Sequence, residues 1–196
     1  MSEREVSTKH FNGGNVFGRV EGDIKKETSR GGKEYISFTV NVSGSRCGSV
    51  TAYCRMWGED RVAPFLKALK KNPHGHYWLK GFFGQYWNEQ NQVFSNFTIF
   101  QFEERASDPR AAFILKGLVD QAQPVKTGQR ILMHVAREGA EKENFELWSP
   151  DEKLLDLVEP GQLIEAKGYV RQECPEDDFG GSTGPVRAYV EQLRIF

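Results

Sequence analysis

The sequence predicts an all-β protein made of two tandem five-stranded barrels, with a short helix in each. Three observations lead to this prediction. Apolar and polar residues alternate over short segments, turn-forming residues cluster between those segments, and the second half of the chain repeats the order of elements in the first. The 196 residues are 38% hydrophobic, which is enough apolar material for one large domain or for two small ones, each with its own core.

Three strands are expected at the start of the chain. The first runs from about residue 15 to residue 28 and ends at the flexible turn Ser29–Gly32. Residues 35–42 alternate strictly between apolar and polar side chains, and residues 49–57 do the same. Because successive side chains of a strand point to opposite faces, both segments are predicted to be half-buried strands.

A helix and two further strands complete the first half. Apolar residues three or four positions apart over residues 62–69 predict a helix of about three turns that ends before Asn72. Strands are expected at residues 77–88 and 93–103. Three strands, a helix and two strands is the order of an OB-fold.

The second half follows the same plan in shorter form. Strands are expected at residues 113–119, 131–136, 144–148 and 190–196, with a helix over residues 150–157. Trp57-Gly58 corresponds to Trp148-Ser149, and the segment 75–81 corresponds to 161–168. We therefore expect one OB domain over residues 1–105 and a second OB domain over residues 106–196.

Charge is divided unevenly between these halves. Residues 1–105 contain 15 Lys and Arg against 11 Asp and Glu, a net charge of +4, whereas residues 106–196 contain 11 against 16, a net charge of -5. A positive surface attracts the phosphates of a nucleic acid. Only the first half is therefore electrostatically suited to such a partner.

Several classes of protein are not favoured by the sequence. The start of the chain is polar and no run of about 18 apolar residues occurs, so we expect a cytoplasmic protein without membrane contact. Cys47, Cys54 and Cys174 lack metal-ligand spacing and are read as reduced thiols. Because no nucleophile–base, phosphate-loop or metalloprotease motif is present, we expect a non-enzymatic protein without a cofactor or metal.

The first half has more aromatic residues than its core positions need. Those on the outer faces of the expected strands are interleaved with Lys and Arg, and the first hairpin adds four cations. Unstacked bases bind aromatic rings at about 1 to 3 kcal/mol each, while cations contact the phosphates between them. The candidate DNA-binding residues are Tyr35, Tyr53, Arg55, Trp57, Trp78, Lys80, Phe82, Tyr86, Trp87, Lys25, Lys26, Arg30 and Lys33.

These motifs resemble those of bacterial single-stranded DNA-binding (SSB) proteins over residues 12–104. The resemblance implies an OB barrel that wraps single strands over aromatic side chains, with Trp57 at a stacking position and Thr51 where a tryptophan is usual. The matching segments are Asn15-Val16-x-Gly18-Arg19-Val20, Ser37-Phe38-Thr39-Val40-x-Val42-Ser43, Trp57-Gly58 and Tyr77-x-Leu79-Lys80-Gly81-x-Phe83.

Two features depart from that family. The chain ends in an expected strand where the family has an acidic tail that recruits replication proteins, although Glu176–Phe179 has a similar composition and is read as a loop tip. The second barrel is negative and places Glu146 on an outer face, so it is expected to bind DNA poorly or not at all, and to serve assembly or partner binding instead. Its weaker candidate residues are Trp148 and Lys167.

The predicted function is sequence-tolerant binding of single-stranded DNA in replication, repair or recombination, by a homodimer. Two other interpretations remain open. The aromatic face could be buried in a protein contact, as an interaction module of a replication or conjugation complex, because aromatic patches also mark protein interfaces. The barrel could instead bind RNA, which OB-folds also do.

Overall fold

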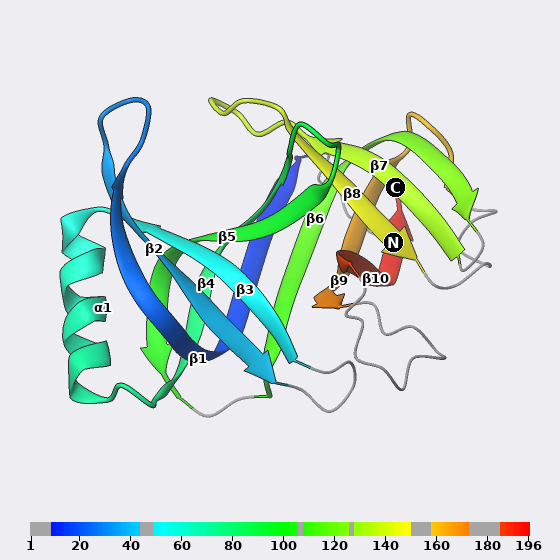
Figure 1. The fold of residues 1–196 in the computed structure, drawn as a ribbon. Helices are drawn as coiled ribbons and strands as arrows, with labels where there is room; N and C mark the ends of the chain where they lie inside the picture. The colour runs from blue at the N-terminus through cyan, green and yellow to red at the C-terminus, as the bar shows by residue number, and fades with distance from the viewer. Residues whose placement is uncertain (1–8, 44–48, 106–107, 126–127, 150–157, 173–184) are drawn as a thin grey trace, which may run out of the picture. The chain divides into compact units, whose positions relative to one another are not determined.

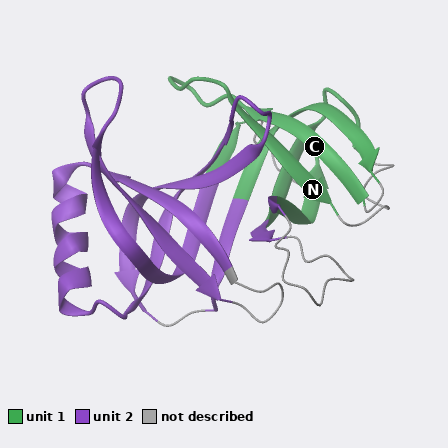
Figure 2. Cartoon of the chain, in the orientation of Figure 1, with its two compact units in different colours: residues 1–12, 114–168, 188–196 green, residues 13–113, 169–187 purple. Residues whose placement is uncertain are grey.

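The chain forms two compact units, coloured separately in Figure 2. The computed structural model describes residues 9–43, 49–105, 108–125, 128–149, 158–172 and 185–196. Unit 1 comprises residues 1–12, 114–168 and 188–196, and unit 2 comprises residues 13–113 and 169–187. The division into domains 1–105 and 106–196 stays a prediction.

Unit 2 takes most of its residues from five strands and a helix, labelled in Figure 1. The elements in chain order are β1 (Phe11–Thr28), β2 (Glu34–Ser43), β3 (Ser49–Trp57), α1 (Glu59–Lys71), β4 (His76–Trp87) and β5 (Val93–Glu104). Strand pairing follows the ring β1-β2-β3-β5-β4, and β4 pairs back with β1. The parallel β3–β5 pairing covers only Tyr53–Met56, so the barrel is joined weakly at that seam.

The core of unit 2 follows from the alternation along its strands. The inward residues of β2 and β3 are almost fully buried, whereas their neighbours lie on the outer face. Phe65 of α1 packs between Phe38 and Phe102, with ring centroids 5.0 and 5.1 Å away. The Tyr77 hydroxyl lies 3.1 Å from the carbonyl oxygen of Ala68, which ties β4 to the end of the helix. The Phe65 side chain of α1 is therefore part of the core of unit 2.

Unit 1 takes most of its residues from five further strands. They are β6 (Arg110–Val125), β7 (Gly128–Val135), β8 (Glu143–Ser149), β9 (Leu163–Gln172) and β10 (Val186–Ile195). The pairing order β6-β7-β8-β10-β9, with a further β6–β9 pairing, repeats that of β1 to β5. The helix expected at 150–157 and the loop containing Glu176–Phe179 lie outside the described residues.

Two glycines mark equivalent points in the two rings. A Cβ on Gly18 would collide with the carbonyl oxygen of Asn41, and a Cβ on Gly117 would collide with that of His134. When residues are counted along the paired strands from these two glycines, Glu146 of β8 is equivalent to Tyr53 of β3, and Trp148 is equivalent to Arg55. The sequence-based correspondence of Trp148 with Trp57 is therefore wrong by two residues.

The predicted fold class is confirmed. The described residues are mostly strand, with one helix in unit 2. Strands β2 and β3 and the end of α1 lie within one residue of their expected positions. β1 begins at Phe11 and β6 extends over Arg110–Val125, both longer than expected. The longer strands bend at bulges, after Glu21 in β1 and after Val119 in β6, which the alternation pattern does not show.

Candidate nucleic-acid interface

Four predicted residues come together on the outer side of β2 and β3, which we call the β2–β3 face: Tyr35, Tyr53, Arg55 and Trp57. Trp57 is paired across the strands with Tyr35, and their ring centroids lie 4.4 Å apart. The Arg55 guanidinium lies 5.7 Å from the Tyr35 centroid. Tyr53 is 57% exposed. Two packed rings thus sit beside a cation and a freely accessible ring, which suits base stacking with phosphate contact.

An acid that the sequence did not single out borders this face. The Ser37 hydroxyl donates to Glu27 Oε1 at 3.0 Å. Hydrogen bonds from Tyr35 and Ser37 lower the pKa of the Glu27 carboxyl below its usual value, and the same contact raises the pKa of the Tyr35 hydroxyl. Glu27 therefore stays ionised, and it orients Tyr35 against Trp57.

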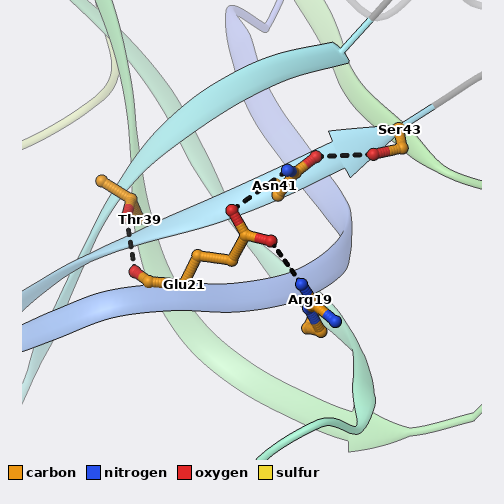
Figure 3. A network of polar contacts seen from close by, with 5 residues as sticks. All are labelled: Arg19, Glu21, Thr39, Asn41 and Ser43. Atoms are coloured by element: carbon orange, nitrogen blue, oxygen red, sulfur yellow. Dashed lines mark hydrogen bonds and ion pairs between the residues drawn. The ribbon is translucent and has the colours of Figure 1, made fainter.

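A polar network on the same side of β1 and β2 is shown in Figure 3. The Glu21 carboxylate accepts hydrogen bonds from Arg19 Nη2 at 2.7 Å and from Asn41 Nδ2 at 3.0 Å. Thr39 Oγ1 donates to the backbone carbonyl of Glu21 at 2.7 Å. Because the β1–β2 register shifts directly after Glu21, these bonds hold β1 and β2 together at the irregularity.

The hairpin cations are all exposed, but they do not share one face. Lys25 is paired with Ser37 and therefore lies on the side of Arg55. Lys26 is paired with the inward Ile36 and belongs to the opposite side of β1. Arg30 and Lys33 lie at the turn. Lys25 is thus the hairpin cation best placed beside the β2–β3 face.

The β4 candidates occupy the same outer surface across β5. Strand pairing puts Arg55 beside Thr98, and Thr98 beside Phe82, in one row over β3, β5 and β4. Phe82 is half-buried against Phe100, with centroids 5.2 Å apart. Strands lie about 4.8 Å apart, so this row connects Arg55 with Phe82 over roughly 10 Å. Thr98 was missed by the sequence analysis, although it alternates with buried residues of β5.

Trp78 and Lys80 extend this surface along β4. The Arg105 guanidinium lies 4.2 Å from the centroid of the half-buried Trp78 ring, which is therefore covered on one side. Lys80 is exposed between Trp78 and Phe82. Arg105 contacts Glu103 at 3.5 Å. Lys80 is accordingly available for phosphate contact, whereas Trp78 is available for stacking only if Arg105 moves.

The β4–β5 hairpin carries an exposed aromatic pair. Tyr86 and Phe94 are stacked, with centroids 5.3 Å apart and an interplanar angle of 15°. They are 47% and 37% exposed, and the adjacent Trp87 is 37% exposed. Phe94 was not singled out from the sequence, because the Tyr86–Phe94 pairing depends on the register of the hairpin.

Unit 1 presents different chemistry at the corresponding place, which we call the β7–β8 face: Arg130, Leu132, Glu146 and Trp148. Glu146 is only 7% exposed. Its Oε2 accepts from Arg130 Nη2 at 2.6 Å, and its Oε1 accepts from Trp148 Nε1 at 3.1 Å. Lys167 lies apart from this group on β9, 3.1 Å from Glu165. The two weaker candidates are therefore both held by carboxylates.

Other chemistry finds little support in the described residues. Within the described ranges no three His, Cys, Asp or Glu side chains gather as metal ligands. In the same ranges no helix has the length and apolarity to cross a bilayer. Cys54 is buried, which raises the pKa of its thiol far above the usual range. Cys47 and Cys174 lie outside the described residues.

The two five-stranded rings, with α1 between β3 and β4, define a tandem OB-type protein. The wild-type single-stranded DNA binding protein from Thermus aquaticus has this fold, with a TM-score of 0.66, 12% identity, and coverage of 96% of this chain and 94% of its own. A deletion mutant of that protein aligns with a TM-score of 0.64 and 11% identity over 96% of both chains. The predicted resemblance is thus matched at the level of the fold. No protein-family model and no curated sequence matches the chain.

Proposed function

We propose that this chain binds single-stranded DNA with little sequence preference, and that the outer surface of β2, β3, β5 and β4 in unit 2 is the binding surface. Bases stack on Tyr53 and on the Tyr35–Trp57 pair, while Arg55, Lys25 and Lys80 contact phosphates. The fold shared with Thermus aquaticus single-stranded DNA binding protein supports this proposal. No catalytic step is part of it.

The observation that carries the proposal is the pairing of an exposed ring with an exposed cation on the β2–β3 face. Tyr53 is 57% exposed, and Arg55, two residues further along β3, is exposed beside the Tyr35 ring. A large aromatic side chain is more stable buried than exposed to water, so the exposed position of Tyr53 favours a role in binding. Stacking together with charge is the combination that single strands require.

The biological setting belongs to the same proposal. A cytoplasmic homodimer that covers single strands during replication, repair or recombination fits a short footprint per chain, and replication proteins are its expected partners. Sedimentation equilibrium of the full chain tests the dimer. A mass equal to one chain at all concentrations would contradict the homodimer but not the binding of single-stranded DNA.

Fluorescence anisotropy of labelled oligonucleotides tests the function. We expect an oligo-dT strand to bind, a matched duplex to bind far more weakly, and the affinity for the strand to fall between about 50 and 200 mM salt. Tyr53→Ala and Arg55→Ala should each weaken binding by about 1 to 3 kcal/mol. Arg61→Ala, which removes an exposed cation from α1, is the matched control and should bind as the wild type does.

The same titration separates the other interpretations. Equal affinity for a matched RNA strand would extend the function to RNA. No binding to either strand, or equal binding to duplex, would contradict the proposal and leave the β2–β3 face as a protein contact.

A further inference from the structure

The two units place different side chains at equivalent points of the same fold. In unit 2, β3 exposes the Tyr53 ring and the Arg55 guanidinium. In unit 1, the equivalent residues of β8 are Glu146, in place of Tyr53, and Trp148, in place of Arg55. Unit 1 therefore has a carboxylate where unit 2 has the exposed Tyr53 ring.

The surroundings of Glu146 resemble those of a bound phosphate oxygen. A guanidinium nitrogen and an indole N–H converge on its two oxygens, at 2.6 and 3.1 Å. Charge-assisted donors of this kind bind carboxylates and phosphates alike. The Glu146 side chain is 8% exposed, whereas the Arg130 side chain that holds it is 36% exposed and remains within reach of solvent.

We propose that the β7–β8 face is a latent binding site for a single-stranded nucleic acid, in which Glu146 fills the phosphate position. This inference rests on the proposed function of unit 2. The Glu146 carboxylate accepts hydrogen bonds from Arg130 and from the Trp148 N–H, so neither donor is offered to a phosphate. Loss of the carboxylate releases Arg130 for a phosphate beside a Trp148 ring on which a base can stack.

Glu146→Gln in the full chain tests the proposal by anisotropy with oligo-dT long enough to reach both units. The variant should bind at least about fivefold more tightly than the wild type, the free energy of one weak base stack. The slope of log affinity against log salt should steepen by about 0.7, one added phosphate contact on a single strand. Glu141→Gln, an exposed position in the β7–β8 loop with the same change in charge, should match the wild type.

Two further variants make the outcome specific. Glu146→Met removes the carboxylate with a side chain of similar size and tests the proposal even if the glutamine variant folds poorly. Adding Arg130→Ala to either variant should abolish the gain, whereas Arg130→Ala alone should leave binding unchanged because the site is already filled.

The failures of the two proposals are distinguishable. If the wild type does not bind oligo-dT, the proposed function fails. If the wild type binds and Arg55→Ala weakens it, but both Glu146 variants bind like Glu141→Gln, the latent site is overturned and the function stands. A gain for a poly-glutamate peptide without a gain for oligo-dT would also overturn it, by assigning the face to an acidic protein.

Discussion

The β2–β3 face of unit 2 and the β7–β8 face of unit 1 differ in chemistry although the strands beneath them are paired in the same order. The inward residues of the two units are alike. Apolar side chains alternate along the strands of both units, and each unit needs a glycine where its first two strands approach closely. The outward residues differ. Unit 2 exposes Tyr53 and Arg55, whereas unit 1 buries Glu146 beneath Arg130. The inner faces thus specify the fold, and the outer faces specify what each unit can bind.

The largest expected effect concerns the packing of α1 in unit 2. Phe65→Ala removes a fully buried ring that contacts Phe38, Tyr77 and Phe102, and should destabilise unit 2 by about 3 to 5 kcal/mol. Amide hydrogen exchange should show protection lost in β2 and β4 but retained in β7 and β8. An equal loss of protection in both units would show that they unfold as one.

The next effect comes from reversing the charge of the β2–β3 face. Arg55→Glu replaces a phosphate contact with a repulsive charge and should weaken oligo-dT binding by about 2 kcal/mol or more, some 30-fold. Arg61→Glu makes the same change of charge on α1 and should cost much less. If the two variants lose equal affinity, net charge governs binding and the β2–β3 face does not.

A smaller effect is expected at the β4–β5 hairpin. Tyr86→Ala should weaken oligo-dT binding by about 1 kcal/mol, the lower end of the range for one stacked base, because Phe94 already occupies one face of its ring. Isothermal titration calorimetry of Tyr86→Ala beside Tyr53→Ala compares the hairpin with the β2–β3 face. A larger loss for Tyr86→Ala would move the centre of the site to the hairpin.

The smallest effect is a pH dependence confined to unit 1. His10 Nδ1 accepts a hydrogen bond from the Ala136 N–H at 2.7 Å. Burial lowers the pKa of His10 below its usual 6.5, with further lowering from His134 and Lys116. The folded unit therefore binds fewer protons than the unfolded chain just below pH 6.5, so the contribution of His10 is complete above that pH and is lost as the pH falls.

His10→Gln keeps a hydrogen-bond acceptor but does not titrate. Thermal unfolding at about pH 7.5 and pH 5.5 should show a smaller loss of stability on acidification in this variant than in the wild type. Asp120, His134 and Lys142, which face one another beside His10, are unchanged in both proteins. Identical pH dependences would assign the effect to those groups.

The fold could be predicted further than the site. Alternation with a period of two residues predicted the inward residues of β2 and β3, and the spacing of apolar residues predicted α1. Both patterns can be recognised within a single segment, because burial selects an apolar side chain at each inward position. The pairing of Tyr86 with Phe94, of Glu27 with Tyr35 and of Glu146 with Arg130 depends on the register between strands. Turns set that register, with a bulge between β1 and β2 as well, and a single sequence does not display it.

The most direct test of the central claim is a cross-linking map of the wild-type chain. An oligo-dT strand carrying 5-iodouracil is irradiated in complex with the protein, and the cross-linked peptides are identified by mass spectrometry. Because Tyr53 and Trp57 present rings on the β2–β3 face, we predict cross-links in the peptide containing residues 49–57. Cross-links confined to residues 143–149 of β8, or none at a saturating concentration of protein, would contradict the account.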